Sequence, residues 1–269
     1  MTRDPEDRSA VGGEIPAVTW RGEAIDCGRC PHGRTLRAGG GCEPGRSCVQ
    51  DRYARRIDRF FRVHPGLAND HLDHPYFEVR AIAARHADLF HLKRLVDDED
   101  ETVRHSVAMR LPQKQLLAMA ADPHREVRIR VAWRLEPHLL GRLQRDPDYH
   151  VRSIVARRLP AALLGALVHD PDDAVRAEVA QRLEMPALWA LVDDASVRVR
   201  RVVVERLPVP LLGRCARDPD FGVRWAVTQR ADARVLEQML ADADEEIRRA
   251  ADARLRGATS PEPEGALHG

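Results

Sequence analysis

Hydrophobic and polar positions repeat along most of the chain with a fixed period. Valine or isoleucine followed by arginine recurs every 24 residues over eight consecutive units, without insertion or deletion. A period of roughly 20–50 residues is typical of solenoids, propellers and other repeat arrays. The chain is therefore predicted to be a stack of short, similar units. The repeated pairs begin at Val79, Val103, Val127, Val151, Val175, Val199, Val223 and Ile247.

Each unit is predicted to begin with an α-helix, as the unit that starts at Asp146 illustrates. Aspartate followed by proline, here Asp146 and Pro147, is typical of a helix start. The carboxylate accepts from unpaired N–H groups, and proline needs no donor at the first helical position. Pro160 cannot continue a helix and marks its end. We therefore expect a helix over residues 147–158 and its equivalents.

The apolar residues of the unit predict one buried face and a second, shorter helix. Val151, Val155 and Leu159 lie four residues apart, which makes one apolar stripe along a helix. Leu164 and Leu167, three residues apart, suit a short 3₁₀ or α turn. Because a unit of this size cannot bury its own apolar face, neighbouring units must stack. The sequence thus predicts an all-α solenoid of eight repeats.

The unit differs from two common repeat classes and resembles a third. Leucine-rich repeats have a similar period but an alternation that makes a strand, and HEAT or armadillo units are about 40 residues or longer. The pattern D-P-x-x-x-V-R-x-x-V-A-x-R-L-P-x-x-L-L-x-x-L, over roughly residues 74–256, resembles the leucine-rich repeat variant family. The resemblance implies a right-handed solenoid in which an α-helix alternates with a 3₁₀-helix.

Four cysteines ahead of the repeats form a candidate metal site. Cys27, Cys30, Cys42 and Cys48 have the spacing C-x2-C-x11-C-x5-C. Four thiolates suit a tetrahedral zinc ion or an iron–sulfur cluster, and the spacing leaves both open. No secretion signal is visible, so we expect a cytoplasmic protein with reduced cysteines, which favours metal ligation over disulfides.

The family resemblance favours one of these metals. Some leucine-rich repeat variant proteins carry a small N-terminal [4Fe-4S] domain with four cysteines in this place. The resemblance therefore implies that the four cysteines bind a [4Fe-4S] cluster, with zinc as the alternative. His32 lies in the same loop and is a weaker candidate ligand, because histidine replaces cysteine in some clusters. Positive charge to balance such a cluster is available from Arg29, Arg34, Arg37 and Arg46.

Arginine recurs at two positions of the repeat. The first column, the arginine of each valine–arginine pair, is matched almost one for one by aspartates, so we expect ion pairs within the solenoid. The second column lies late in the helix, where cations suit the helix dipole, and it is also open to phosphate or an acidic partner. It comprises Arg110, Arg134, Arg158, Arg182, Arg206, Arg230 and Arg254.

Composition limits the functions that remain. Charged residues make up 32% of the chain, yet the formal net charge is +1, which argues against general attraction to nucleic acid or acidic membranes. No apolar run is long enough to span a bilayer. No catalytic spacing is recognisable, and Cys215 occupies a repeat position that is otherwise leucine or methionine, so we predict a core residue and no enzyme.

These observations combine into one interpretation and one alternative. We expect a disordered tail over 1–20, a cluster domain with a capping helix over 21–69, the solenoid over 70–257 and a second tail over 258–269. The interpretation is a monomeric [4Fe-4S] scaffold that binds protein partners on the solenoid and has an electron-transfer or redox-sensing role. The alternative is a zinc-stabilised repeat protein that binds nucleic acid through its arginine columns.

Overall fold

The computed structural model describes residues 15–258, and the regular secondary structure within this range is helical, without any β-strand. The chain divides into two compact units, Met1–Leu135 and Glu136–Gly269. The predicted all-α repeat architecture is confirmed. Of the two predicted tails, residues 1–14 and 259–269 lie outside the described part.

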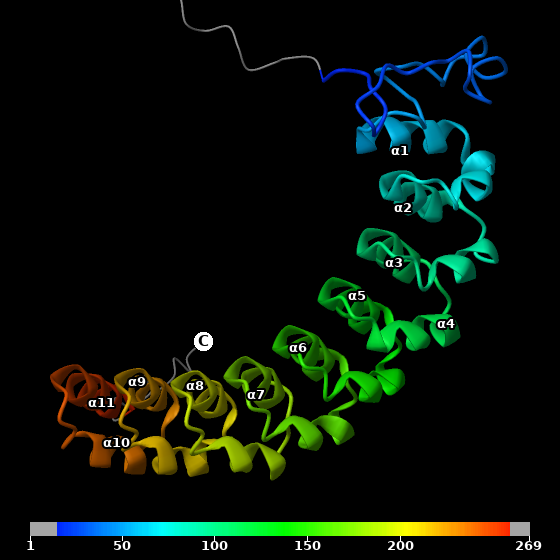
Figure 1. The fold of residues 1–269 in the computed structure, drawn as a ribbon. Helices are drawn as coiled ribbons and strands as arrows, with labels where there is room; N and C mark the ends of the chain where they lie inside the picture. The colour runs from blue at the N-terminus through cyan, green and yellow to red at the C-terminus, as the bar shows by residue number, and fades with distance from the viewer. Residues whose placement is uncertain (1–14, 259–269) are drawn as a thin grey trace, which may run out of the picture. The chain divides into compact units, whose positions relative to one another are not determined.

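The first unit holds the cysteine segment and the first repeats. Residues 15–53 form turns and isolated bridges, such as the one between Val18 and Ala24, and the first helix follows directly. Helix α1 packs on α2 and on η1, and α2 packs on α3 (Figure 1). The helices are α1 (Ala54–Val63), η1 (Pro65–His71), α2 (Phe77–His86), η2 (His91–Leu95), α3 (Glu101–Ala108), α4 (Gln113–Ala118), η3 (Met119–Ala121) and α5 (Arg125–Arg134), where η denotes a 3₁₀-helix.

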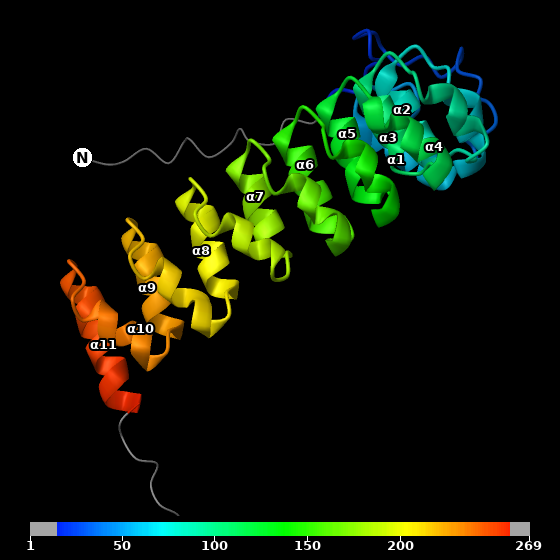
Figure 2. The ribbon, with the colours of Figure 1, turned by 90° about the horizontal axis from the view of Figure 1, so that it is seen from below.

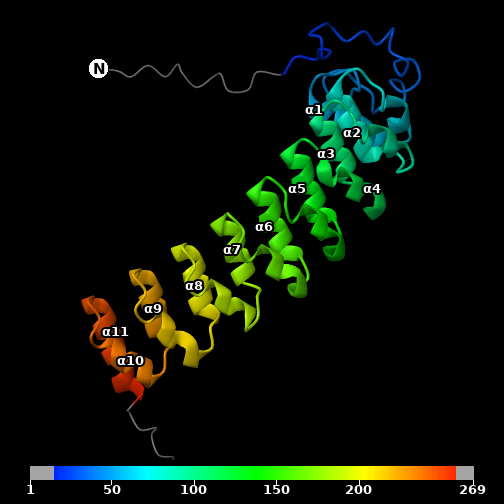
Figure 3. The same ribbon diagram turned by 60° about the horizontal axis from the view of Figure 1, so that its bottom comes forward.

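The second unit contains the later repeats. Its longer α-helices lie side by side in one layer, and the short helices that connect them form a second layer (Figures 2 and 3). Within the layer of longer helices, α6 packs on α7, α7 on α8, α8 on α9, and α9 on α11. The helices are η4 (Pro137–Leu143), α6 (Tyr149–Arg158), η5 (Ala161–Leu167), α7 (Asp173–Ala180), η6 (Ala187–Leu191), α8 (Val197–Arg206), η7 (Val209–Cys215), α9 (Phe221–Arg230), α10 (Ala233–Met239) and α11 (Glu245–Ala258).

The core of each unit consists of the apolar positions that define the repeat. Val151, Val155 and Leu159 are fully buried, and so is Leu164 of the following 3₁₀-helix. The aliphatic residues of the α-helix thus meet those of the short helix between the two layers. Removal of this apolar surface from water stabilises the stack, because each repeat supplies only part of a core.

The start of the repeat helix differs from the prediction. Helix α6 begins at Tyr149 rather than at Pro147. Asp148, not Asp146, caps the helix by accepting from the His150 N–H at 2.8 Å. Asp146 instead accepts from the Asp148 N–H at 2.9 Å, which forms a turn before the helix. The proline therefore lies in that turn, and the two aspartates have different roles.

Candidate metal centre

A buried ion pair ties the cysteine segment to the first helix. The Arg56 guanidinium donates to Asp51 Oδ2 at 3.1 Å, and both side chains are buried. Arg56 also donates to the backbone carbonyls of Pro16 at 3.2 Å and Ile15 at 2.6 Å. Asp51 Oδ1 accepts from the Tyr53 N–H at 2.9 Å, immediately before α1. Because buried charges are tolerated only when paired and hydrogen-bonded, this network fixes the segment on α1.

All four predicted ligand cysteines lie in this segment as free thiols. Cys42 and Cys48 are buried, whereas Cys27 and Cys30 are half-buried. The turn that carries the first pair requires a glycine at position 33. A Cβ atom on Gly33 would lie 1.9 Å from the Cys27 carbonyl oxygen, closer than any two such atoms approach. The backbone of this turn is therefore packed directly against the first cysteine.

The thiols lie near enough to affect one another's ionisation. Burial, with smaller contributions from the neighbouring thiols of Cys42 and Cys30, raises the pKa of the Cys48 thiol to about 12. Burial, Cys30 and Cys27 likewise raise the pKa of Cys42. Four free, neighbouring thiols are the donor set that an iron–sulfur cluster takes. Within residues 15–258, no three histidine, cysteine, aspartate or glutamate side chains are grouped as a site for a single metal ion.

The cysteine loop contacts η1 and α1 through His32. His32 Nε2 lies 2.9 Å from His71 Nε2, so one ring donates a hydrogen bond and the other accepts it. Burial lowers the pKa of both histidines, that of His71 to about 4. Both rings are therefore neutral near pH 7. The His32 ring also packs against Phe60, with the ring centroids 5.4 Å apart. His32, a candidate ligand in the sequence, thus has a partner on η1.

A second contact between the loop and α1 is formed at Gly41. Its backbone has φ of +86°, in the region that favours glycine, and a Cβ atom there would lie 2.6 Å from Val63 Cγ1. The Gly41 carbonyl accepts from Ser47 Oγ at 2.6 Å. The residue beside Cys42 is therefore fixed both to the loop and to the end of α1.

The arginines of the loop differ in their electrostatic partners. Arg29 pairs with Asp26 at 3.4 Å, and Arg46 pairs with Glu43 at 3.7 Å. Arg37 lies close enough to Cys42 to oppose the rise in its pKa. Among these three arginines, Arg37 therefore has the most direct electrostatic effect on a ligand cysteine.

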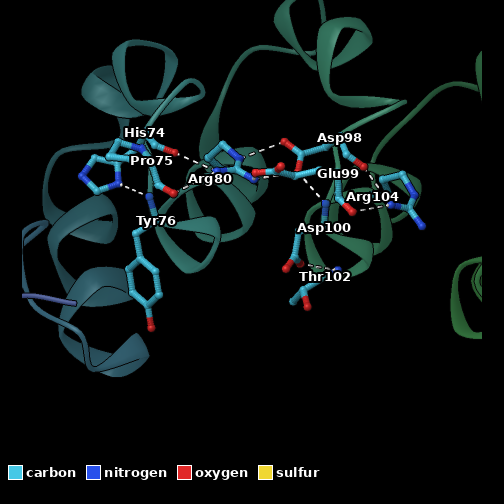
Figure 4. A network of polar contacts seen from close by, with 9 residues as sticks. All are labelled: His74, Pro75, Tyr76, Arg80, Asp98, Glu99, Asp100, Thr102 and Arg104. Atoms are coloured by element: carbon cyan, nitrogen blue, oxygen red, sulfur yellow. Dashed lines mark hydrogen bonds and ion pairs between the residues drawn. The ribbon is translucent and has the colours of Figure 1, made fainter. Parts of the chain in front are cut away.

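The first arginine column joins one repeat to the next. Arg80 donates from Nε and Nη2 to the two carboxylate oxygens of Asp98, each at 2.8 Å (Figure 4). Its Nη1 donates to the His74 and Pro75 carbonyls at 2.9 and 3.3 Å. The predicted structural role of this column is confirmed. The same pairing recurs between Arg104 and Asp122, Arg152 and Asp170, Arg176 and Asp194, Arg200 and Asp218, and Arg224 and Asp242.

The second arginine column caps the helix of the preceding repeat. Arg182 Nη1 donates to the carbonyls of Ala156 at 2.7 Å and Leu159 at 2.8 Å, at the end of α6. A cation at this end of a helix also interacts favourably with its dipole. The sequence left this column open to phosphate, but the guanidinium groups are bound to backbone oxygens. The same contacts are made by Arg110, Arg134, Arg206, Arg230 and Arg254.

Cys215 and the grooves between repeats belong to the scaffold. Cys215 is buried in η7, and burial raises its pKa to about 11, as expected for a core residue that carries no reactive thiolate. A cavity of about 600 Å³ lies beside Arg224 and Asp242, and one of about 270 Å³ lies beside Arg104 and Asp122. These grooves are thus lined by the arginine–aspartate pairs themselves.

Comparison with known proteins identifies both parts of the chain. Residues 17–70 match a family model described as the FeS4 cluster of leucine-rich repeat variant proteins, and residues 149–172 match the leucine rich repeat variant model. A solved structure, described as a leucine-rich repeat variant with a novel repetitive protein structural motif, is 41% identical with a TM-score of 0.81. The match covers 86% of this chain and 99% of that one. The chain belongs to the leucine-rich repeat variant family.

A shorter match links this leucine-rich repeat variant protein to a bacterial relative. The relative, described as an uncharacterized 27.7 kDa protein in the nifB 3′ region of Rhodobacter capsulatus, is 50% identical over 95 residues. The match covers 35% of this chain and 38% of the length of that relative. The family implies an iron–sulfur cluster in residues 17–70, and its helical repeat fold is compatible with protein binding. No helix within residues 15–258 has the length and apolar character needed to cross a membrane.

Proposed function

We propose that Cys27, Cys30, Cys42 and Cys48 ligate a [4Fe-4S] cluster and that the protein is a cytoplasmic redox scaffold without enzymatic activity. The repeats provide the surface for a protein partner. The cluster either passes single electrons to that partner or reports the redox state to it. The observation that carries the proposal is the set of free, neighbouring thiols within the segment that matches the FeS4-cluster family.

The two pairs of cysteines give the proposed site a protected side and an accessible side. Cys42 and Cys48 are buried, so the protein excludes water from their sulfur atoms. Cys27 and Cys30 are half-buried and lie nearer to solvent. A [4Fe-4S] cluster supplies one-electron chemistry when bound, at a potential set by burial and nearby charge. The accessible side is therefore where a docked partner lies close enough to exchange an electron with the cluster.

Contacts between the loop and the helices couple the proposed site to the repeats. His32 contacts His71 of η1, and Gly41 abuts Val63 at the end of α1. Loss of the cluster frees the loop that makes these contacts, because a site assembled by folding loses its ligand-derived stability without the ligand. We therefore expect cluster loss to loosen the contact of the cysteine segment with α1 and η1.

Metal analysis of anaerobically purified protein tests the proposal. We expect a brown protein with about four irons per chain. Serine in place of Cys27, Cys30, Cys42 or Cys48 should abolish cluster binding, whereas Cys215→Ala, the matched control, should keep it. About one zinc per chain in a colourless protein would overturn the cluster. Full cluster content in Cys42→Ser would overturn the ligand set.

Redox cycling separates the two proposed roles. A cluster that is reduced by dithionite and reoxidised without loss of iron supports electron transfer. Loss of the cluster on oxidation supports redox sensing if proteases then cleave the cysteine loop, which packs against α1, at a different rate. A stable cluster that cannot be reduced and leaves the loop unchanged on oxidation contradicts both roles.

A further inference from the structure

His64, at the end of α1, has a buried ring nitrogen without a hydrogen-bond partner. Its Nε2 is shielded from water and makes no hydrogen bond within the described residues. A buried polar atom that stays unpaired costs free energy, so such an atom in a folded protein needs an explanation. The other unpaired atoms of this kind in residues 15–258 belong to Ser106, Gln115 and His124, in the repeats. His64 is therefore the one that lies beside the cysteine segment.

The unpaired nitrogen faces the cysteine loop. A Cβ atom on Gly41 would lie 3.1 Å from His64 Nε2 and 3.5 Å from its Cε1, so this edge of the ring abuts the loop backbone. Gly41 directly precedes Cys42, a proposed cluster ligand that is buried. Glycine at position 41 therefore allows the imidazole to approach the backbone immediately beside a ligand cysteine.

The same ring also lies near the segment that carries the first cysteine pair. His64 and His32 both pack on the buried ring of Phe60, with centroid distances of 5.2 and 5.4 Å. His32 follows Cys30 by two residues. Because His32 Nε2 is already paired with His71 Nε2 at 2.9 Å, these two histidines satisfy each other. His64 is left with a buried nitrogen that can serve another partner.

The fold fixes the position of His64. Its backbone N–H donates to the Phe60 carbonyl at 2.9 Å, and its carbonyl accepts from the Leu67 N–H at 3.1 Å, so the residue joins the end of α1 to the start of η1. Its ring is packed on the ring of Phe60. A donor that is held in place by the fold needs little reorganisation when negative charge develops next to it.

We infer that His64 donates a hydrogen bond from Nε2 to a sulfur atom of the proposed [4Fe-4S] cluster and thereby raises its reduction potential. The inference rests on the cluster ligation proposed above and names a residue that tunes that site. Hydrogen bonds to the sulfur atoms are among the factors that set the potential of an iron–sulfur cluster. Because reduction adds negative charge, the hydrogen bond is stronger in the reduced state and favours it.

A hydrogen-bond donor suits this position better than a further ligand. Four cysteines already supply the ligands that a [4Fe-4S] cluster takes. A neutral imidazole carries a proton on one ring nitrogen and donates from there. Loss of a ligand removes iron, whereas loss of a donor leaves the iron in place and shifts the potential. The two roles of His64 are therefore distinguishable by experiment.

Redox titration of the cluster-loaded full-length protein, followed by visible absorption, tests the inference. His64→Phe keeps a ring against Phe60 but has no donor, whereas His64→Gln keeps an N–H donor. At a fixed ambient potential, we expect His64→Phe to lower the ratio of reduced to oxidised cluster on the order of tenfold, and His64→Gln to restore most of it. His86→Phe is the matched control, because His86 stacks on Phe61 and lies 3.6 Å from Asp58.

A second measurement needs no variant and decides the question if His64→Phe fails to hold iron. Pulsed electron paramagnetic resonance of the reduced wild-type protein, with isotopically labelled histidine, should detect a weak coupling between the cluster and a histidine nitrogen. Absence of that coupling, or an unchanged ratio in His64→Phe with full iron content, would overturn the inference. A strong coupling, with iron lost from both His64 variants, would overturn it by making His64 a ligand.

Iron analysis separates failure of the inference from failure of the proposed function. Full cluster content in the wild type and in His64→Phe, with the same potential in both, contradicts the hydrogen bond alone and leaves the cluster in place. Zinc instead of iron in the wild-type protein overturns both proposals, because no cluster is then present to accept the hydrogen bond.

Discussion

Arg152 and Asp170 are joined by two parallel hydrogen bonds across successive repeats. Arg152 Nε lies 2.7 Å from Asp170 Oδ2, and Nη2 lies 2.9 Å from Oδ1. Both side chains are buried. Asp170 Oδ1 also accepts from the Asp172 N–H at 2.9 Å, in the turn that leads to α7. One carboxylate thus joins two repeats and shapes the turn between them, which explains why an aspartate accompanies the arginine in almost every unit.

Removal of this carboxylate should destabilise the protein strongly. In Asp170→Ala, Arg152 keeps its charge in a buried position without its partner, so we expect the free energy of unfolding to fall by about 3 kcal/mol. Urea unfolding followed by circular dichroism measures this. Glu245→Ala removes the partner of Arg249 in an exposed pair and should cost less than about 1 kcal/mol. Equal effects of the two variants would mean that the buried pair has no special role.

The arginines that cap the preceding helix should also contribute to stability. Arg182→Met keeps the aliphatic length of the side chain but loses the hydrogen bonds to the Ala156 and Leu159 carbonyls. We expect a loss of about 1–2 kcal/mol in the free energy of unfolding, because charge-assisted hydrogen bonds at a helix end are lost. The exposed Arg198, changed to methionine, is the control. An unchanged unfolding midpoint for Arg182→Met would show that the carbonyls are satisfied equally well by water.

The sequence was sufficient for the repeat architecture because the repeat is regular. Most units place their aliphatic residues at the same intervals, and Val151, Val155 and Leu159 are buried as their spacing predicts. The helix start was wrong because the aspartates on either side of Pro147 both look like caps. Asp146 and Asp148 differ only in which N–H each can reach, and that depends on the turn conformation.

Some contacts between residues far apart in the chain leave no signal in the sequence. Arg182 bonds to carbonyls of the preceding repeat, and a backbone oxygen leaves no mark in a residue pattern. The sequence indicates His32 only as a candidate metal ligand, although its Nε2 lies 2.9 Å from His71 Nε2 on η1. The close approach of Gly33 to the Cys27 carbonyl likewise appears only in the folded turn. The four cysteines were identifiable because their spacing is itself the signal.

The turn that follows Cys30 should tolerate only glycine at position 33. A Cβ atom in Gly33→Ala would overlap the Cys27 carbonyl oxygen, so the turn must move, and we expect iron content per chain to drop severalfold. Gly39→Ala is the matched control, because its nearest neighbour would lie 3.9 Å away. Iron analysis and visible absorption of both purified variants provide the measurement. Full iron content in Gly33→Ala would show that the turn adjusts without disturbing the first cysteine pair.

Protonation of His71 should make the free energy of unfolding of the protein depend on pH. Burial, aided by His32 and His74, lowers the pKa of His71 from 6.5 to about 4, so the unfolded chain binds a proton at higher pH than the folded protein. The corresponding stabilisation is complete above about pH 6.5 and is lost as the pH falls towards 4. After allowance for solvent screening, we expect a loss of about 2 kcal/mol over that range.

The slope of stability against pH, rather than its absolute level, tests this role of His71. Urea unfolding of the cluster-loaded protein at several values between pH 7 and pH 5 should give a shallower slope for His71→Gln than for the wild type, because glutamine does not titrate. His32 and His74 also have lowered pKa values, so part of the slope should remain. The exposed His138, changed to glutamine, is the control variant. A wild-type slope in His71→Gln would mean that His71 is not the group whose protonation weakens the contact between the cysteine loop and η1.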